Sequence, residues 1–585
     1  MLSLGIHFGH DASVSVCSPD GVLFSLQEER VSRIKHHCGF PRRGIELALT
    51  RFGRLGRDIP VVAFSTSEVI APEHPNAWVV PAEGDRQSCG GAVGDPQRLT
   101  KIRDKVRRTW SEFAERHWSS HVEFMRDIGM LDRDVTHYYV AHHRAHAASA
   151  FRLCGIRDQP VTVVTCDGKG DGLSAAIYRG EVDGTLTYLR GSLPQHSVGM
   201  FYQAVTEALG FVPVEGEYKT MGLAAFGTVN GRPNPFAGIV SVDDGVLTSR
   251  IAWKAAPYND RHPENRVANP IGSVIQADDF QRLLETCSDA DLACFAQAHF
   301  EEVMLGLTSD AQRIAGSRHL AAAGGVILNV KANALIRERL CPSSFFVYPD
   351  SADSGLSAGA ALEALFFEGQ VTHPATFTNP YLGHEFDEGS VSAAVARWTS
   401  EHSLVAEHAT PADVAARVAA GAIVGTFQGR LETGPRALGN RSVIADPRRL
   451  DVKDRINLLL KGREPFVPFA PSVLEEDAHL YWNGSTDYPF MTFAVRASDY
   501  AKQAVPAVVH VDGTLRPQVV NEMRNARYTE LLRAFKAISG VGVLVNTSFN
   551  RHGHPIVGSP DDALLHLVNG WVEGVWIGDW YVRRR

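Results

Sequence analysis

VTVVTCDGKGDG, residues 161–172, carries the strongest indication of how this chain folds. Its first six residues are apolar or β-branched, as in a strand buried in a sheet, and the six that follow are turn sequence. A second apolar run, LSAAIY, continues to Arg179 and Gly180, and a third lies within residues 185–189. The pattern predicts a three-stranded meander with an aspartate in its first turn.

The same pattern of short apolar runs separated by turn residues occurs at the start of the chain. Residues 2–8, 12–17 and 21–27 are short apolar runs, separated by GHD at 9–11 and PDG at 19–21. Two strand-turn-strand units, each with an aspartate in the first turn, indicate a duplicated α/β core. This is the pattern of the actin-like, sugar-kinase-like architecture, in which facing halves hold a phosphoryl compound between their turns.

Two later segments extend this core. GGVILNVKANALI, from Gly324, predicts a glycine turn and a helix start that serve as an additional phosphate loop. DSGLSAGAAL, residues 353–362, predicts a helix of small residues with Asp353 at its N-terminus. Residues 368–383 are rich in Gly, Pro and Thr without clear periodicity, so we expect two domains, 1–372 and 373–585.

The C-terminal part predicts a second α/β domain. Apolar strands are expected at residues 422–427, 543–545 and 575–582, and helices at 412–420 and 528–538. Four blocks with Arg, Lys, Ser or Asn accompany them: GRLETGPRALGNRS (429–442), KGREPFVPFAPS (461–472), HVDGTLRPQ (510–518) and NTSFN (546–550).

Positive charge is local in this chain. Between Arg430 and Arg463 there are nine basic residues and four acidic ones, whereas the whole chain has a net charge of −8. A cationic pocket in an acidic protein, with a pI near 6.3, fits a small anion such as a nucleotide or an acyl phosphate better than a nucleic acid. The alternative is that these arginines are ordinary surface residues or pair with carboxylates.

The AHHRAHA segment, residues 141–147, predicts a metal site. On a helix, His142 and His146 project from the same face, while His143 points elsewhere. With Asp167 and Asp353 at two other predicted element ends, the set suits a divalent first-row metal with one position left open. The alternative is a pair of core or surface histidines. No HExxH motif occurs, so a zinc peptidase is not favoured.

Composition sets the class of protein. A length of 585 residues predicts two or more domains, and no apolar run is long enough for a membrane span. The N-terminus lacks a basic n-region, so we expect no signal peptide. The eight cysteines form no CxxC pair, which favours buried thiols in a reducing compartment and therefore a cytoplasmic protein.

Two segments leave alternatives open. In EYKTMGLAAFG, residues 217–227, Lys219 either neutralises a phosphate or orients an acceptor, or else forms an interdomain ion pair. The architecture of residues 60–133 cannot be assigned from their charges and turn residues.

Taken together, the blocks resemble the O-carbamoyltransferases of nodulation-factor and antibiotic biosynthesis, which include the tobramycin, cephalosporin, novobiocin and ansamycin enzymes. The resemblance covers nearly the whole chain. It is carried by FGHDASV, QEERVSRIKH, HHRAHA, DGKGDG, EYKTMGLAAFG, GGVILNVKAN, DSGLSAGAAL and YLGHEF together with the four cationic blocks. Thr433, Ala352 and Tyr488 depart from the family pattern, which bears on the shape of the acceptor pocket.

The resemblance implies a two-domain enzyme. Its N-terminal domain is similar to the actin-like threonylcarbamoyl transferase of tRNA modification, and its C-terminal domain to the YrdC-like threonylcarbamoyl-adenylate synthase. The second domain would form carbamoyl adenylate from carbamoyl phosphate and ATP with Mg²⁺. The first would pass the carbamoyl group to a hydroxyl of a small-molecule acceptor, a natural product or a sugar.

The resemblance also implies roles for individual residues. An iron-type divalent metal, Fe(II) or a similar ion, would be held by His142, His146, Asp167 and Asp353. Carbamoyl phosphate and the nucleotide phosphates would be bound by Lys461, Arg516, Ser548, Asn550, Arg436 and Arg441, with Lys461 and Arg516 also catalytic. Further nucleotide-facing positions would be Lys219, Gly168, Gly170, Asp171, Gly324, Gly325, Asn329 and Asn546. From their place in the first turn, His10 and Asp11 are candidates for activating the acceptor hydroxyl.

Other functions remain open at this point. An actin-like sugar kinase would use the same N-terminal loops, but it leaves GPRALGNRS and NTSFN unexplained. A tRNA-modifying enzyme is a third alternative, but this chain is acidic and its sequence shows no basic face for RNA. A nucleotide-binding scaffold without turnover is a further alternative. The sequence names neither the acceptor nor the metal, and it leaves a homo-oligomer open.

Overall fold

The computed structural model describes residues 1–66, 119–132, 134–251, 287–462 and 464–585. Most of the unassigned 60–133 segment, together with Arg463, lies outside the described residues. Of that segment, the structure describes strand β4 (Val61–Thr66) and helix α4 (Ser119–Asp127).

The first sheet has the strand order β3-β2-β1-β4-β5. It contains β1 (Ser3–Phe8), β2 (Ser13–Ser18), β3 (Gly21–Gln27), β4 and β5 (Thr136–Tyr139). β1, β2 and β3 form the predicted meander with antiparallel pairing, while β4 and β5 continue parallel to β1.

The second sheet repeats this arrangement. Its order is β12-β11-β6-β7-β8, with β6 (Val161–Gly170), β7 (Leu173–Gly180), β8 (Leu186–Ser192), β11 (His319–Ala323) and β12 (Ser344–Val347). The first three strands are again antiparallel, and β11 and β12 are again parallel to the first. The duplicated actin-like core is therefore confirmed.

The DGKGDG segment differs from its prediction in one respect. β6 continues through Asp167 as far as Gly170, with a register shift between Cys166 and Gly170. The tight turn falls on Asp171 and Gly172, whose φ angles are 46° and 80°. An Asp-Gly pair with both φ angles positive is suited to a two-residue hairpin turn, so the aspartate expected in the turn lies on the strand instead.

Two helices join the sheets. α5 (His142–Arg152) packs on β6 and β11, α11 (Leu356–Phe367) packs on β1, β2 and β4, and the two helices pack against each other. Gly359 allows the close approach, since a Cβ there would lie 1.9 Å from the backbone oxygen of Ala145. The helix pair therefore connects the two sheets.

The remaining elements of this part surround the sheets. The helices are α1 (Glu29–Ser32), α2 (Arg42–Phe52), α6 (Val198–Ala208), α7 (Glu217–Leu223), α9 (Asp289–Ala315) and α10 (Val330–Leu340), and β9 (Val240–Asp243) pairs with β10 (Val246–Ser249). The helix predicted after Gly324 is α10, and the side chain of Asn329 caps it by accepting from Ala332 N.

The C-terminal part is built on a mixed eight-stranded sheet. Its order is β13-β22-β21-β14-β15-β20-β16-β19. The strands are β13 (Leu404–His408), β14 (Val424–Phe427), β15 (Ser442–Ala445), β16 (Ala470–Leu474), β19 (Gln518–Val520), β20 (Val543–Ser548), β21 (Gly574–Ile577) and β22 (Trp580–Arg584).

Helices accompany this sheet: α12 (Glu388–Glu401), α13 (Pro411–Ala419), α14 (Asp451–Ile456), α15 (Ala478–Tyr481), α16 (Asp499–Ala504), α17 (Glu522–Ser539) and α18 (Pro560–Val568). A short pair, β17 (Val495–Arg496) and β18 (Thr514–Leu515), lies apart from it. The single strand predicted at 575–582 was wrong. The chain turns at Gly578, where φ is 51°, and forms the β21–β22 hairpin.

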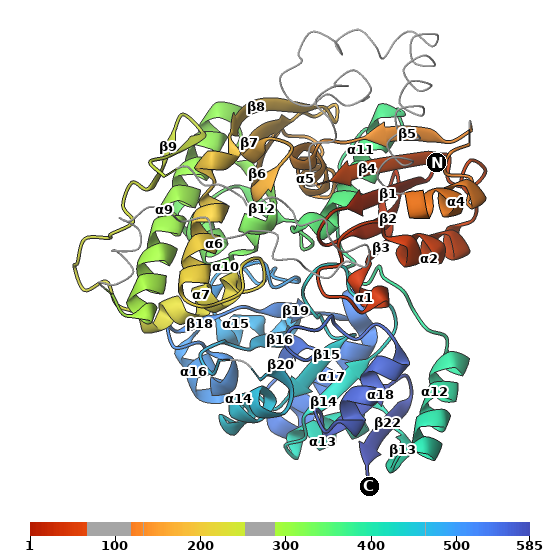
Figure 1. Ribbon diagram of the computed structural model, residues 1–585. Helices are drawn as coiled ribbons and strands as arrows, with labels where there is room; N and C mark the ends of the chain where they lie inside the picture. The colour runs from red at the N-terminus through yellow and green to blue at the C-terminus, as the bar shows by residue number, and fades with distance from the viewer. Residues whose placement is uncertain (67–118, 133, 252–286, 463) are drawn as a thin grey trace.

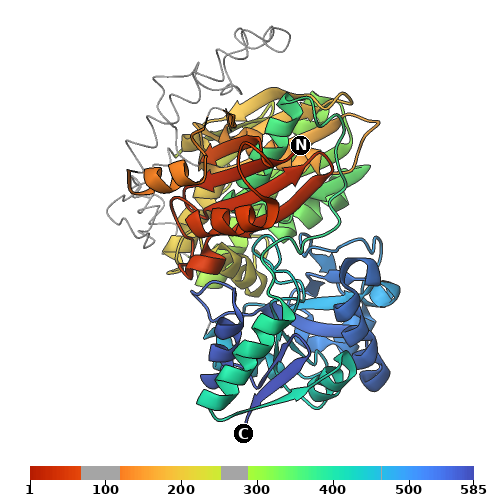
Figure 2. The ribbon, with the colours of Figure 1, turned by 90° about the vertical axis from the view of Figure 1, so that its right-hand side faces the viewer.

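The two parts lie one above the other, with the N-terminal sheets in the upper half of the view and the C-terminal sheet in the lower half (Figures 1 and 2). Within the described residues, no helix has the length and apolar character needed to cross a membrane. The cysteines there are all free thiols, but only Cys17 and Cys166 of them are buried, so the expectation of buried thiols holds in part.

Candidate functional site

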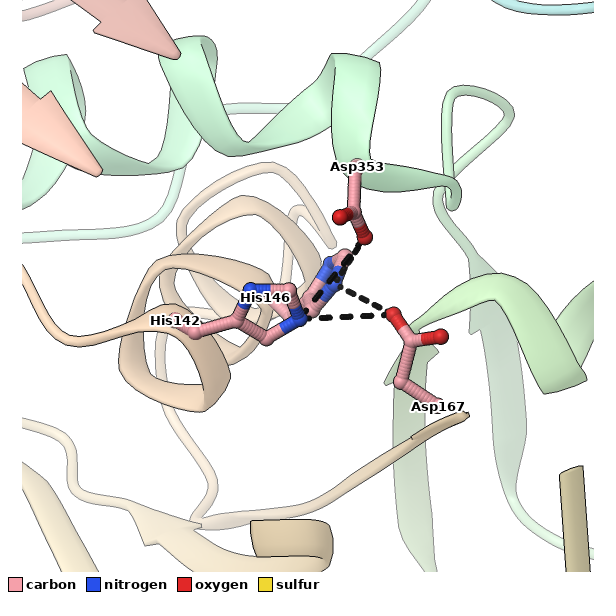
Figure 3. A group of neighbouring side chains, drawn as sticks. All are labelled: His142, His146, Asp167 and Asp353. Atoms are coloured by element: carbon pink, nitrogen blue, oxygen red, sulfur yellow. Dashed lines mark hydrogen bonds and ion pairs between the residues drawn. The ribbon is translucent and has the colours of Figure 1, made fainter. Parts of the chain in front are cut away.

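Four predicted metal ligands meet at one point (Figure 3). His142 and His146 lie on successive turns of α5, Asp167 lies on β6, and Asp353 begins the 3-10 turn η5 (Asp353–Gly355) before α11. Asp167 Oδ2 is 3.4 and 3.1 Å from Nε2 of His142 and His146, and Asp353 Oδ1 is 3.7 and 3.6 Å from the same atoms. Ligands of one ion bound at about 2.1 Å lie about 3.0–3.4 Å apart. The Asp167 distances fall in this range and the Asp353 distances exceed it by a few tenths of an ångström, so a small shift of Asp353 lets the four residues hold a divalent cation.

Neighbouring groups orient these ligands. Gly168 N donates to Asp167 Oδ1 at 2.6 Å, which leaves Oδ2 directed at the histidines. Asp171 accepts from His142 N at 2.7 Å and from Tyr139 Oη at 3.0 Å. A Cβ at Gly170 would lie 2.2 Å from the His142 ring. Gly170 and Asp171, predicted to face a nucleotide, therefore support the histidine side of the site.

The charges of the cluster favour a bound cation. Burial acts to lower the pKa of His142, but the charges of Asp353 and Asp167 outweigh it and raise that pKa to about 9. Burial likewise acts to raise the pKa of the Asp167 and Asp353 carboxyls, and the facing imidazoles hold both below their usual range. Without a metal, the His142 imidazole thus holds a proton that a divalent ion would displace.

His10 and Asp11 extend this cluster. His10 Nε2 lies 3.3 Å from Asp353 Oδ2, and His10 Nδ1 donates to Asp11 Oδ2 at 3.0 Å. Asp11 Oδ1 in turn lies 2.8 Å from Nδ1 of His36. Although burial opposes it, the charges of Asp353 and Asp11 raise the pKa of His10 to about 10. His10 can therefore accept a proton only when another cation offsets the charge of Asp353.

Lys461 joins two of the cationic blocks. It ends the π-helical turn η6 (Asn457–Lys461) and is buried. Its Nζ donates to the backbone oxygens of Ser548 and Asn550 at 2.6 and 3.0 Å, and lies 3.1 and 3.0 Å from their side-chain oxygens. KGREP and NTSFN, far apart in sequence, form one cation-lined corner.

Asn546 links the other two blocks. Its Nδ2 donates to Ala437 O at 3.1 Å, to Ser472 Oγ at 2.9 Å and to Gln518 Oε1 at 2.9 Å. These three partners lie in the GPRAL, KGREP and HVDGT blocks. The amide therefore holds the blocks together at the cavity, which Asn546 itself lines.

Arg436 and Arg441 have different surroundings. The Arg441 guanidinium is fully buried, donates to the backbone oxygens of Gln428, Asn440 and Gly429, and lies 3.6 Å from the ring centre of Phe427. Arg436 lines the cavity, and the described residues include no hydrogen-bond or ion-pair partner for it. Desolvation lowers the pKa of Arg436 to about 10, so it stays charged and can take an anion.

One cavity of about 840 Å³ connects the two parts of the protein. Predicted residues that line it are His10, Asp11, Asp167, Gly168, Gly325, Asn329, Asp353, Arg436, Lys461, Arg516, Asn546, Ser548 and Asn550. Predicted residues outside its lining are His142, His146, Gly170, Asp171, Lys219, Gly324 and Arg441. Metal-site carboxylates and the cationic blocks thus face the same space.

Lys219 forms an ion pair between the two parts, one of the alternatives left open by the sequence. Its Nζ lies 3.0 Å from Glu464 Oε1 and 5.5 Å from the ring centre of Phe211. Sequence reasoning missed a similar link, in which Lys331, two residues after Asn329, lies 2.5 Å from Asp512. It also missed that Glu29 and Arg30 line the cavity and that Arg33 contacts the C-terminal part. The many charged residues of QEERVSRIKH could have indicated a role for this segment.

Comparison with known proteins identifies the class. A duplicated actin-like core with a His₂Asp₂ cluster, sharing a cavity with an α/β domain that carries the four cationic blocks, defines a two-domain group-transfer enzyme. The family models of the carbamoyltransferase N-terminus and C-terminus match residues 2–362 and 415–584. The chain belongs to the carbamoyltransferase family and is an enzyme with carbamoyltransferase activity.

Similar proteins extend over the whole chain. Nodulation protein NolNO of Sinorhizobium fredii is 31% identical over 100% of this chain and 80% of its own length. The 3'-hydroxymethylcephem-O-carbamoyltransferase of Amycolatopsis lactamdurans is 28% identical over 100% of this chain and 99% of its own. Among solved structures, (R)-2-hydroxyglutaryl-CoA dehydratase component A of Acidaminococcus fermentans covers 63% of this chain and 99% of its own at 11% identity. Its TM-score of 0.32 is too low to carry an argument.

Proposed function

We propose that this protein is an ATP-dependent O-carbamoyltransferase. It makes carbamoyl adenylate from carbamoyl phosphate and ATP, and then transfers the carbamoyl group to a hydroxyl of a small natural-product or sugar acceptor. The observation that supports the proposal is the shared cavity, which is lined by Asp167 and Asp353 on one side and by Arg436, Lys461 and Arg516 on the other.

The first step belongs to the cationic side. Water first cleaves carbamoyl phosphate to carbamate and phosphate. A carbamate oxygen then attacks the α-phosphorus of ATP, and pyrophosphate leaves with the bonding electrons, which gives carbamoyl adenylate. Two anions must approach each other, which requires fixed positive charge. Arg436, Lys461 and Arg516 provide that charge beside Ser548 and Asn550, with Mg²⁺ on the nucleotide.

The second step belongs to the metal side. The acceptor oxygen attacks the carbamoyl carbon, the bond to the phosphate oxygen breaks, and AMP leaves with the electron pair. A divalent ion, of the iron type by family resemblance, held by His142, His146, Asp167 and Asp353 would supply Lewis-acid polarisation of the carbonyl or of the leaving phosphate. His10, oriented by Asp11, lies beside Asp353 and would take the acceptor proton.

The division of labour follows the proposed domains. Residues 1–372 would form the actin-like transfer domain with the metal site, and residues 373–585 the YrdC-like adenylate-forming domain. The proposal places the enzyme in the cytoplasm with small-molecule substrates. The cephem carbamoyltransferase relative is named for a hydroxymethyl acceptor, which supports an alcohol as the acceptor class here.

Two assays test this function. Purified enzyme with ATP, Mg²⁺ and carbamoyl phosphate should catalyse carbamoyl-phosphate-dependent exchange of pyrophosphate into ATP, and Arg516→Ala should abolish it. Mass spectrometry of candidate hydroxyl metabolites should then find a carbamoyl mass increase. A sugar kinase would phosphorylate its acceptor without carbamoyl phosphate, and the absence of exchange in metal-loaded enzyme would refute the proposal.

A further inference from the structure

Helix α1 lies at the junction of the two parts of the protein (Figure 1). Its C-cap residue is Arg33, with a left-handed φ of 63°. The Arg33 guanidinium donates to Ile556 O at 2.6 Å and to Pro555 O at 3.0 Å, and its Nε lies 3.2 Å from Asp562 Oδ1. Arg33, a residue of the N-terminal part, thus binds two backbone oxygens and one carboxylate of the C-terminal part.

Backbone packing at the same place is very close. A Cβ on Gly558 would lie 1.9 Å from Arg30 O, so only glycine allows this loop to rest on α1. The buried Arg30 also donates from Nη2 to Gly434 O at 3.1 Å, in the GPRAL turn. Two loops of the C-terminal domain therefore rest on one short helix.

These contacts form one wall of the shared cavity. Glu29 and Arg30 of α1 and Ile556 of the loop all line the cavity, whereas Arg33 lies behind them. On the N-terminal side, Glu29 accepts from His36 N at 2.8 Å, and His36 contacts Asp11. On the C-terminal side, Asn550 Nδ2 donates to His554 O at 2.6 Å, which ties the loop to the Lys461 corner.

We propose that Arg33 is a positioning residue that holds the 554–558 loop on α1 and so keeps water away from carbamoyl adenylate between the two steps. The inference rests on the proposed function. If the wall opens, water attacks the carbamoyl carbon and AMP leaves with the electron pair. The products are AMP and carbamic acid, which decomposes to CO₂ and ammonia. Arg33 touches no substrate, so adenylate formation continues without it.

The test needs no acceptor. Wild type, Arg33→Ala and Gly558→Ala are incubated with ATP, Mg²⁺ and carbamoyl phosphate, and two rates are measured: pyrophosphate exchange and net AMP release. Both variants should release AMP about tenfold faster than wild type, because exclusion of water from a reactive intermediate depends on closure of the site, while exchange stays within about twofold. A merely structural role would lower both rates together.

Matched variants control for charge and for the added methyl group. Arg42→Ala removes an exposed arginine that pairs with Glu46 on the neighbouring α2, and Gly306→Ala adds a Cβ that meets Val242 at an ordinary 3.6 Å. Both should behave as wild type. Arg33→Lys keeps the charge but loses the planar guanidinium that reaches two carbonyls and a carboxylate. It should therefore still release AMP faster than wild type.

The outcomes separate the two claims. If wild type supports exchange but Arg33→Ala and Gly558→Ala keep its ratio of AMP release to exchange, the positioning role is wrong and the proposed function stands. If wild type shows no carbamoyl-phosphate-dependent exchange, the proposed function is wrong and the positioning role falls with it. Gly558→Ala decides the matter alone should Arg33→Ala fail to fold.

Discussion

Oδ2 of Asp353 lies 3.3 Å from Nε2 of His10. The other oxygen of the same carboxylate lies 3.6 Å from Nε2 of His146, in the metal cluster. Asp353 thus connects the cluster with the side chain that we propose as the base of the transfer step. Charge placed in the cluster consequently changes how firmly His10 holds its proton.

Replacement of His10 tests its role in transfer. His10→Ala should lower the rate of transfer from preformed carbamoyl adenylate about 10²-fold, because a positioned base contributes on that scale. Pyrophosphate exchange and metal content should stay unchanged, since His10 is not among the four ligands. Transfer is measured with the acceptor found by mass spectrometry, and an unchanged transfer rate would remove His10 from the mechanism.

Replacement of His146 tests the metal site. His146→Ala leaves three ligands, so the metal content of the purified protein, measured by elemental mass spectrometry, should fall well below one equivalent. Transfer should be lost while exchange persists. His143→Gln is the control, because His143 lies on the same helix but hydrogen-bonds with Thr165 instead. Full metal content in His146→Ala would contradict the assignment.

Metal affinity should depend on pH through His142. Its pKa in the metal-free protein is raised from 6.5 to about 9, mainly by Asp353 once burial is overcome, and only the neutral imidazole binds a metal. Raising the pH toward 9 should therefore tighten binding by about tenfold per pH unit. Competition with a chromogenic chelator measures this, and an affinity independent of pH below 9 would contradict it.

Arg436 and Arg441 should respond in opposite ways. Arg436→Ala should impair pyrophosphate exchange and leave the melting temperature almost unchanged, since the described residues give it no partner. Arg441→Ala leaves the backbone oxygens of Gln428 and Gly429 without a donor, because only Asn440 O keeps another one, and should destabilise the protein by about 3 kcal/mol. Thermal unfolding and exchange rates are measured side by side. Equal kinetic defects with no loss of stability would refute this distinction.

Glu217 should make stability depend on pH. Burial raises the pKa of its carboxyl from 4.5 to about 7. A raised pKa in the folded state means that its stabilising contribution is complete below pH 4.5 and is lost as pH rises to 7. The free energy of unfolding of wild type relative to Glu217→Gln should therefore fall by about 1–3 kcal/mol across that window. Chemical denaturation at several pH values tests this, and a constant difference would contradict it.

Local sequence was sufficient for most of the secondary structure. The alternation of residues 2–27 and the repeat after Val161 specified two meanders, because strand burial and turn residues act over a few positions. Where a turn depended on a single residue, prediction was weaker. Asp171 rather than Asp167 occupies the hairpin turn, and Gly578 divides one apolar run into two strands.

Residue chemistry also indicated the metal site. The i, i+4 spacing of His142 and His146 places both on one helix face whatever the rest of the chain does. Their meeting with Asp167 and Asp353 depended on how α5, β6 and α11 pack. That packing brings together residues more than two hundred positions apart, a distance that no local pattern specifies.

By itself, the sequence determined a duplicated α/β core, a second α/β domain, a histidine pair and a set of cationic loops, since each follows from short-range spacing and residue type. Tertiary structure alone decided which of those residues share a cavity. Arg436 lines the cavity, whereas the Arg441 guanidinium binds backbone carbonyls. Lys219 pairs with Glu464, and Gly558 packs against α1. The physical reason is that side-chain direction and domain contact are fixed by long-range packing, which sums many weak interactions between segments distant in the chain.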